Sequence, residues 1–381
     1  MKILVNENVL FGKDAFSTLG EVTVFSGRTL HRRQLDGVSA LIVRSTTPVD
    51  AHLLAGTQVR FVGTTTAGVE HIDQAYLAAQ GIGFASATGA NANSVAEYVL
   101  AALLWYAHSQ GIQLRGTSLG IIGVGNIGSL VARKVTALGM EVILHDPPLA
   151  RLTGKSCYRP LAEVLQADIL TLHVPLTHDG LDPTYHLLDS HQLSRLSPST
   201  LLINTARGEV VETRALLQVL ASGHLRPPII DVWEQEPHIE WKLVDHTAIA
   251  TPHIAGHSYD GKIRGTQMVY EAACRFFGMT PTWTMTMACE ALPPLTFDAY
   301  GQDGQEVARR LTEHFYDLRK DDCRMRALLD LPHEDRAHAF DRLRLTYPVR
   351  REFSSRAIRL LHGNPHLVHM LTEIGFRVLP G

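Results

Sequence analysis

The stretch 119–146, LGIIGVGNIGSLVARKVTALGMEVILHD, constrains the fold more than any other part of the chain. It begins with a short apolar run that has the length and the β-branched content of a buried strand. Glycines at 123, 125 and 128 follow in the G-x-G-x-x-G spacing, and residues 126–138 have the apolar periodicity of a helix. A second apolar run, 142–144, ends at an aspartate. This order of strand, turn, helix and strand predicts the βαβ unit of a nucleotide-binding fold.

Each part of this unit suits a dinucleotide. Gly123 permits a tight turn, Gly125 lets the backbone approach a pyrophosphate, and Gly128 lets the helix pack on the strand. The helix start offers unpaired N–H groups and a positive dipole end to the phosphates. Asp146 lies 23 positions after Gly123 (146 − 123), close to the offset of about 20 at which a carboxylate binds an adenosine ribose. An acid at this position favours NAD, because it repels the additional phosphate of NADP.

Composition excludes several other classes of protein. The chain has 381 residues, enough for two or three domains, and its net charge of −3 argues against a general affinity for nucleic acid. Four cysteines have no metal-binding spacing, which favours a reducing compartment. The longest apolar stretch, 95–107, contains Glu97 and is too short to span a membrane. We therefore expect a cytoplasmic protein with no metal site and with neither nucleic acid nor membrane as a partner.

Residues 1–93 alternate short apolar runs with helical patterns, which predicts a second parallel, doubly wound sheet without a glycine fingerprint. The predicted strands are KILVNEN, EVTVF, ALIVRST, VRFVGTT and IGFASA, and the predicted helices are 11–19, 49–56 and 70–80. The next segment, 94–110, is apolar nearly all round and predicts a buried helix, with Ser94 and Glu97 as its capping box.

Six strands separated by helices are predicted between 120 and 252, which suits a complete Rossmann dinucleotide-binding fold. The strands are LGIIGV, EVILHD, DILTLHVPL, TLLINTA, PPIIDVW and TAIATP, and the helices lie near 160–166, 189–196 and 212–222. A further helix is predicted at 258–278, and it is expected to cross back to the first domain.

The part from about 290 to 381 is expected to form an additional α+β domain after a linker at 281–295. Val307, Leu311, Phe315 and Leu318 predict an amphipathic helix within a long charged helix at 304–329, and LRLTYPV and FRVL predict strands. The whole chain is thus expected to be α/β. Residues 1–93 and 256–284 are assigned to a flavodoxin-like substrate domain, 94–255 to the NAD-binding Rossmann domain, and 285–381 to the C-terminal domain.

Three residues with suitable chemistry follow predicted strands. Arg207 lies in INTARGEV, and a guanidinium binds a carboxylate with two hydrogen bonds. Glu236 lies in DVWEQEP and His253 in ATPHIAG, and a histidine next to a carboxylate can exchange a proton near neutral pH. Each residue alone also has a structural explanation, as a turn, a solvated acid or a core histidine. Their order behind the glycine fingerprint favours a joint catalytic role.

Together these motifs resemble those of the NAD-dependent D-2-hydroxyacid dehydrogenases. The matching pieces, between residue 1 and about 278, are VRSTTPV, TTTAGVEHID, the glycine fingerprint, LHVPLT, INTARGE, DVWEQEP and TPHIAG. The resemblance implies that Arg207 holds the substrate carboxylate and that Glu236 orients His253, the acid–base. It implies that NAD is bound by Gly123, Gly125, Asn126, Ile127, Gly128, Asp146, Val174, Ala206, Gly208, Asp231 and Gly256, with Asp231 near the nicotinamide.

A branch of this family with an added C-terminal domain resembles the whole chain more closely. The runs at 66–73 and 255–266 carry this resemblance. It implies that a small phosphorylated 2-hydroxy acid is oxidised at C2, that Ser45 and Thr66 contact the substrate, and that the added domain forms a homodimer. His257 stands where the family often has a substrate-binding tyrosine. We expect the distal phosphate to meet Arg44 or an arginine of the C-terminal domain.

Two alternatives remain open at this point. One is a sister enzyme such as 3-phosphoglycerate dehydrogenase, whose C-terminal module would be a small βαββαβ unit that binds an amino acid. The other is a protein without catalytic activity that senses NAD and binds a partner on the same scaffold.

Overall fold

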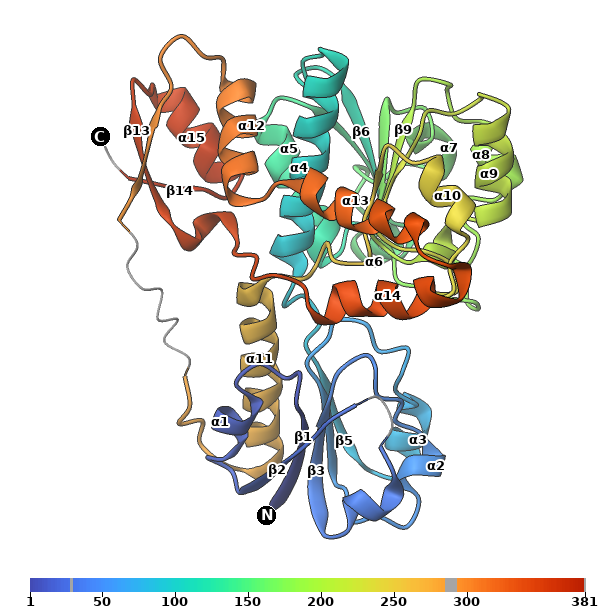
Figure 1. Cartoon of the computed structure of the whole chain (residues 1–381), viewed down its shortest axis with the longest axis vertical. Coiled ribbons are helices and arrows are strands. Elements are labelled where there is room, and N and C mark those ends of the chain that lie inside the picture. Colours follow the sequence, from blue (N-terminus) through green and yellow to red (C-terminus); the bar gives the residue numbers. More distant parts are fainter. Residues whose placement is uncertain (28–29, 285–292, 380–381) are drawn as a thin grey trace. The chain divides into compact units, whose positions relative to one another are not determined.

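The computed structural model describes residues 1–27, 30–284 and 293–379, which form two compact units (Figure 1). The first unit joins Met1–Asn91 to Ser258–Ala291, and the second joins Ala92–His257 to Leu292–Gly381. The chain therefore leaves the first unit and returns to it, as expected for the helix at 258–278. Most of the predicted linker, including Cys289, lies outside the described residues. The division into three domains stays a prediction.

The first unit contains a five-stranded parallel sheet in the order β2-β1-β3-β4-β5. All strands and helices predicted for 1–93 are present, and a short 3-10 helix, η1, was not predicted. The elements are β1 (Lys2–Asn6), α1 (Gly12–Phe16), β2 (Glu21–Phe25), η1 (Arg32–Leu35), β3 (Val38–Val43), α2 (Ala51–Leu54), β4 (Phe61–Thr64), α3 (Gln74–Ala79), β5 (Gly83–Ser86) and α11 (Tyr259–Phe277).

Helices cover both faces of this sheet because its strands are apolar on both sides. Ile42 belongs to the same buried cluster as Phe16 of α1 and Tyr270 of α11, on one face. Leu41, its neighbour in β3, belongs to a second cluster with residues of α2 and α3 on the other face. The continuous apolar runs of the sequence therefore correspond to a sheet buried between two helical layers, as Figure 1 shows.

The second unit contains a six-stranded parallel sheet in the order β11-β10-β9-β8-β6-β7, so the six predicted strands are confirmed. A parallel bridge between Leu144 and Tyr158 adds one more strand position outside β7. Counted with this bridge, the order contains the 3-2-1-4-5-6 arrangement of dinucleotide-binding sheets, and the direction of winding reverses between β6 and β8. The elements are α4 (Ala92–Gln110), β6 (Ser118–Ile122), α5 (Asn126–Ala137), β7 (Glu141–His145), α6 (Pro147–Thr153), α7 (Leu161–Val164), β8 (Ile169–Leu172), α8 (Ser190–Leu193), β9 (Leu201–Asn204), η2 (Gly208–Val210), α9 (Thr213–Ala221), β10 (Ile229–Ile230), α10 (Trp241–Asp245) and β11 (Ile249–Ala250).

The C-terminal region, 293–379, packs within this second unit and has its own parallel sheet in the order β12-β13-β14. The terminal strand in FRVL is confirmed, whereas β12, β13 and α15 were not predicted. The elements are β12 (Leu295–Asp298), α12 (Gly304–Phe315), α13 (Leu318–Arg326), η3 (Ala327–Asp330), α14 (His333–Leu345), η4 (Phe353–Ser355), β13 (Ala357–Leu361), α15 (Pro365–Glu373) and β14 (Arg377–Val378).

Two predictions for this region were wrong. The long charged helix at 304–329 is interrupted at Tyr316, whose backbone is extended, and Asp317 caps the new helix α13. The segment LRLTYPV, at 343–349, is not a strand, because its first residues complete α14. Leu343 packs with Phe340 at helical spacing against one apolar cluster, so tertiary packing selects the helix over the alternating pattern.

The predicted capping box of the buried helix was also wrong. The helix α4 begins at Ala92, so Ser94 and Glu97 both lie inside it. The Ser94 hydroxyl donates to Glu352 at 2.8 Å, and Glu97 accepts the backbone N–H of Phe353 at 3.0 Å. Both side chains therefore connect α4 to the C-terminal region. None of the helices in the described ranges is long and apolar enough to cross a membrane.

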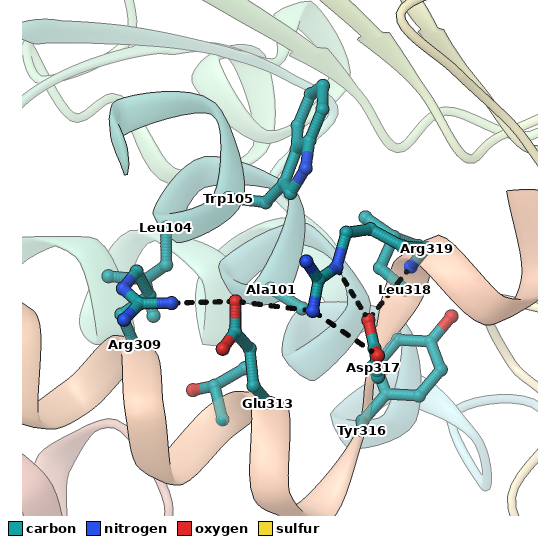
Figure 2. A pocket seen from close by; sticks show the side chains of 10 residues that line it. Ala101, Leu104, Trp105, Arg309, Glu313, Tyr316, Asp317, Leu318 and Arg319 are labelled. Atoms are coloured by element: carbon teal, nitrogen blue, oxygen red, sulfur yellow. Dashed lines mark hydrogen bonds and ion pairs between the residues drawn. The ribbon is translucent and has the colours of Figure 1, made fainter. Parts of the chain in front are cut away.

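The helices α12 and α13 cover α4 beside Trp105 (Figure 2). Two ion pairs lie beside this contact, from Arg309 to Glu313 at 2.7 Å and from Arg319 to Asp317 at 3.0 Å, and their residues line the same pocket as Trp105. The side chains of these pairs are partly exposed, from 14% for Arg309 to 55% for Arg319, and ion pairs that stay in contact with water contribute little stability. The buried side chains of the contact, such as Leu311, provide most of the attachment.

Candidate active site

The loop after β11 carries His253 and is fixed by a buried aspartate. Asp231 follows β10, is 1% exposed, and accepts the backbone N–H groups of Ile254 at 2.8 Å and Ala255 at 3.0 Å. The Thr251 hydroxyl also donates to it at 2.5 Å. Burial raises the pKa of the Asp231 carboxyl, and the hydrogen bonds and His253 oppose this rise. Asp231 therefore organises the loop, and its expected contact with the nicotinamide stays a prediction.

His253 and Glu236 form a hydrogen-bonded pair on neighbouring loops. The Nδ1 atom of His253 lies 2.8 Å from Oε2 of Glu236, and Oε1 accepts the backbone N–H of Trp233 at 3.0 Å. Burial alone would raise the pKa of the Glu236 carboxyl, but His253, the Arg344 cation and the Trp233 N–H hold it below its ordinary value. An ionised carboxylate at Nδ1 leaves Nε2 of the imidazole as the atom for proton transfer.

The histidine backbone is strained. His253 has a φ of 56°, in the left-handed region that residues other than glycine rarely adopt. The Asp231 carbonyl accepts the His253 N–H at 2.7 Å, so the surrounding loop holds this conformation in place. Such strain is characteristic of functional sites.

Arg207 projects from the loop after β9. Asn204 fixes this loop, because its side chain donates to the carbonyl of Arg207 and accepts the N–H of Ala206, both at 3.0 Å. The guanidinium of Arg207 is partly buried and donates to the Ala206 carbonyl at 2.7 Å. Gly208 follows, and an added Cβ there would lie 1.9 Å from the backbone of Trp233, so close packing requires glycine.

The glycine loop between β6 and α5 fits a dinucleotide. Gly123 has a φ of 90°, and an added Cβ would meet the backbone of His173 and the side chain of Val174. A Cβ on Gly128 would lie 2.0 Å from the carbonyl oxygen of Gly123, so α5 could not approach the strand. A Cβ on Gly125 would meet nothing within 4 Å, so space for a phosphate remains at the start of α5. Asn126 and Ile127 form the first turn of that helix.

Asp146 stands at the end of β7, beside this loop. Its Oδ2 accepts the N–H of Val124 at 2.8 Å, and its Oδ1 accepts the N–H of Leu149 at 2.9 Å. Both bonds orient the carboxylate at the carboxyl edge of the sheet, where an adenosine ribose binds in folds of this kind. The residues present therefore suit NAD.

The expected substrate residues of the first unit follow adjacent strands. Ser45 is exposed and comes after β3, and Thr66 comes after β4, so both lie at the carboxyl edge of that sheet. The Thr66 hydroxyl bonds to Thr64 at 2.8 Å. Arg44 lies beside them and acts electrostatically on Lys262 of α11. His257, in contrast, lies in the second unit, where its ring packs against Tyr347 at 5.8 Å.

Sequence motifs did not single out several residues that position the site. Asn204 was hidden inside a predicted strand. Arg344 and Arg350 belong to the C-terminal region, where the sequence predicted an arginine near the substrate phosphate but did not indicate which one. Arg344 lies 3.5 Å from Glu236, and Arg350 donates to the carbonyl of Ala255 at 3.0 Å. Contacts over such separations leave no local pattern.

Comparison with known proteins identifies the family and the fold of the chain. Residues 87–255 match the family "D-isomer specific 2-hydroxyacid dehydrogenase, NAD binding domain", and residues 290–375 match a "Domain of unknown function (DUF3410)". The crystal structure of the TT0316 protein from Thermus thermophilus is 26% identical, with a TM-score of 0.62 over 74% of this chain and 99% of that chain. The NAD-dependent formate dehydrogenase from Staphylococcus aureus, in complex with NAD, shares the fold at 24% identity and a TM-score of 0.60, over 73% and 96% of the two chains.

The two-sheet fold, the family match and the similarity to solved dehydrogenases show that the protein is an NAD-dependent dehydrogenase of the D-isomer specific 2-hydroxyacid class. Curated relatives narrow this class further. The erythronate-4-phosphate dehydrogenase of Proteus mirabilis is 43% identical over 377 residues, which is 99% of either chain, and that of Marinobacter nauticus is 42% identical over 99% of this chain and all of the relative. The chain belongs to the erythronate-4-phosphate dehydrogenase family.

Proposed function

We propose that the protein oxidises 4-phospho-D-erythronate at C2 to (R)-3-hydroxy-2-oxo-4-phosphooxybutanoate, a step in pyridoxal 5′-phosphate biosynthesis. The observation that carries the chemistry is the His253–Glu236 hydrogen bond of 2.8 Å on a loop held by Asp231. The names of the full-length relatives support the substrate. They favour this function over 3-phosphoglycerate oxidation and over a sensor without catalytic activity.

In this mechanism Arg207 binds the substrate carboxylate through its guanidinium, which suits two parallel hydrogen bonds. Neutral His253 removes the proton of the 2-hydroxyl through Nε2. The carboxylate of Glu236 stabilises the imidazolium that forms and keeps the ring in position. Bound NAD supplies the hydride acceptor for C2.

The distal phosphate of the substrate is assigned to Arg44 and Lys262 in the first unit. Burial, followed by repulsion from Arg44, lowers the pKa of the Lys262 ammonium to about 8. Arg44, which precedes Ser45, and Lys262 repel one another, and such a pair of cations forms a favourable place for a dianion, because a phosphate offsets both charges. These charges support a phosphorylated acid over a plain 2-hydroxy acid.

The test is the rate of NADH formation with 4-phosphoerythronate and, in parallel, with 3-phosphoglycerate and unphosphorylated erythronate. We expect the first compound to give the largest kcat/KM by at least about tenfold, since a charge-assisted contact is worth about 1.5–3 kcal/mol. A preference for 3-phosphoglycerate would assign the chain to the sister activity. Lack of turnover with every acid, together with NADH-dependent binding of a partner protein, would support the sensor.

We further propose a cytoplasmic homodimer formed through the C-terminal region. The three described cysteines, at 157, 274 and 323, are free thiols, as suits a reducing compartment. Tyr300, which is 76% exposed, and Leu361, which is 41% exposed, place apolar surface around β12 and β13. Light scattering of the purified chain tests the assembly, and a monomer at micromolar concentration would contradict it.

A further inference from the structure

A cation of the C-terminal region reaches the acid–base pair. Arg344 lies in the last turn of α14, and its Nη1 is 3.5 Å from Oε2 of Glu236. The same oxygen atom lies 2.8 Å from Nδ1 of His253. One carboxylate oxygen is therefore shared between the imidazole and a guanidinium that lies 108 residues further along the chain (344 − 236).

The helix that carries Arg344 is fixed against the segment that follows Glu236. Phe340 of α14 is fully buried in the apolar cluster that contains Ile239 and Trp241. Arg336, one turn earlier, lies over the Trp241 ring at 5.6 Å. Packing of this kind holds the helix at a defined position, so Arg344 is presented to the pair by a rigid element.

The ion pair is largely removed from water. The side chain of Arg344 is 22% exposed and that of Glu236 is 17% exposed. The Nε atom of Arg344 is buried and has no hydrogen-bond partner among the described residues. Charges in such surroundings interact more strongly than a pair at the surface.

We propose that Arg344 is a positioning residue of the acid–base pair: its guanidinium keeps the Glu236 carboxylate ionised and aligned on His253, and it makes the pair harder to protonate. This role rests on the proposed functions of Glu236 and His253. It gives the C-terminal region, which matches a domain of unknown function, a part in the chemistry of the NAD-binding region.

The sign of the effect follows from the charges that face the pair in the second unit. Asp231 acts on His253 from the loop after β10, and Arg344 acts on Glu236 from α14. Tyr347 lies near Asp231 on the segment after α14. Loss of the Arg344 cation makes the local potential more negative, so the pair accepts a proton at higher pH.

The test is the pH dependence of kcat/KM in the full chain for Arg344→Gln, Arg344→Lys and Arg342→Gln. The acidic limb of this profile reports protonation of the pair. We expect Arg344→Gln to move the limb upward by about 0.5–1 pH unit, with a KM for the phosphorylated acid within about twofold of wild type. Arg344→Lys keeps the positive charge, so its limb should lie close to that of wild type. Arg342→Gln removes the same charge from an exposed position of α14 and should leave the limb in place.

Three outcomes would overturn the proposal. An unchanged limb in Arg344→Gln would show that the cation does not act on the pair. If Arg344→Gln raised KM about tenfold while the acidic limb stayed in place, Arg344 would be a substrate ligand instead. An equal shift in Arg342→Gln would reduce the effect to general surface charge. His253→Ala, measured in parallel, separates this failure from a failure of the proposed function, because turnover in that variant would remove the acid–base assignment itself.

Discussion

Arg350 donates a hydrogen bond from Nη1 to the carbonyl oxygen of Ala255 across 3.0 Å, so a side chain of the C-terminal region holds the loop that follows His253. Its Nη2 donates to the carbonyl of Ser94 at 2.7 Å, and its guanidinium lies 3.9 Å over the ring of Tyr316. The residue is only 5% exposed. One buried cation thus connects α4, the active-site loop and the C-terminal region.

Arg350→Ala should therefore lower the free energy of unfolding by about 3–5 kcal/mol, because two buried carbonyl groups lose their donor and nearby carboxylates lose their cation. Urea denaturation followed by circular dichroism measures the change. Arg359→Ala is the matched control, since Arg359 is exposed in β13, and it should stay within about 0.5 kcal/mol of wild type. Equal stability of the two variants would show that Arg350 has no structural importance.

His253→Ala should reduce kcat about 10²–10⁴-fold while the fold and the affinity for NADH are retained, because only the proton acceptor is removed. Stopped-flow kinetics and fluorescence titration with NADH measure the two quantities. His246→Ala serves as a control on a partly buried histidine away from the site, whose Nδ1 lies 2.9 Å from the carbonyl oxygen of Lys242. A kcat within threefold of wild type for His253→Ala would contradict the assignment.

Asp146→Ser should weaken NAD and relax the discrimination against NADP. A carboxylate that binds a ribose through charge-assisted bonds contributes about 1.5–3 kcal/mol, so the KM for NAD should rise about 10- to 100-fold. The ratio of kcat/KM for NAD to that for NADP should fall by a similar factor. Asp168→Ser, which removes a carboxylate from the opposite, amino end of β8, is the control. An unchanged ratio in Asp146→Ser would remove this residue from cofactor selection.

Glu97 should make stability depend on pH. Burial, with a smaller contribution from Glu352, raises the pKa of the Glu97 carboxyl from 4.5 to about 8. Between about pH 4.5 and 8 the folded chain therefore keeps a proton that the unfolded chain has released. The stabilising contribution of Glu97 is fully present below pH 4.5 and is lost as the pH rises through this window. Glu97→Gln keeps an acceptor for the Phe353 N–H but cannot ionise.

The measurement for Glu97 is the urea midpoint of wild type and Glu97→Gln at pH 5 and pH 8. We expect the variant to lose less stability between the two values, by on the order of 2 kcal/mol. Parallel curves for the two proteins would mean that this carboxyl does not titrate in that range.

The sequence predicted the two large sheets well because their strands are short apolar runs bounded by glycine and polar residues. The glycine loop was equally clear, since Gly123 and Gly128 each meet a backbone that excludes a side chain. The C-terminal region was predicted poorly. Its strand β13 is the central strand of a small sheet, but Arg359 and Leu361 are exposed, so the strand lacks a continuous buried apolar run.

Predictions from local sequence patterns were wrong where contacts with distant residues determine the structure. Ser94 and Glu97 have the spacing of a capping box, but their partners are Glu352 and Phe353, more than 250 residues away. The same limit applies to the candidate site. Arg207, Glu236 and His253 stand in recognisable motifs, whereas Arg344 sits in a charged helix without any motif, and only the folded chain brings it to Glu236.

The discontinuity of the first unit has a consequence for synthesis on the ribosome. Its sheet is complete once β5 has been made, but one face awaits α11, which supplies Val269 and Tyr270 to the apolar cluster. Residues 92–257, 166 in number (257 − 92 + 1), are translated in between. At about 5–20 residues per second, about 8–33 s pass before synthesis of its last helix begins, an interval in which α1 covers only part of that face and a chaperone could bind the rest.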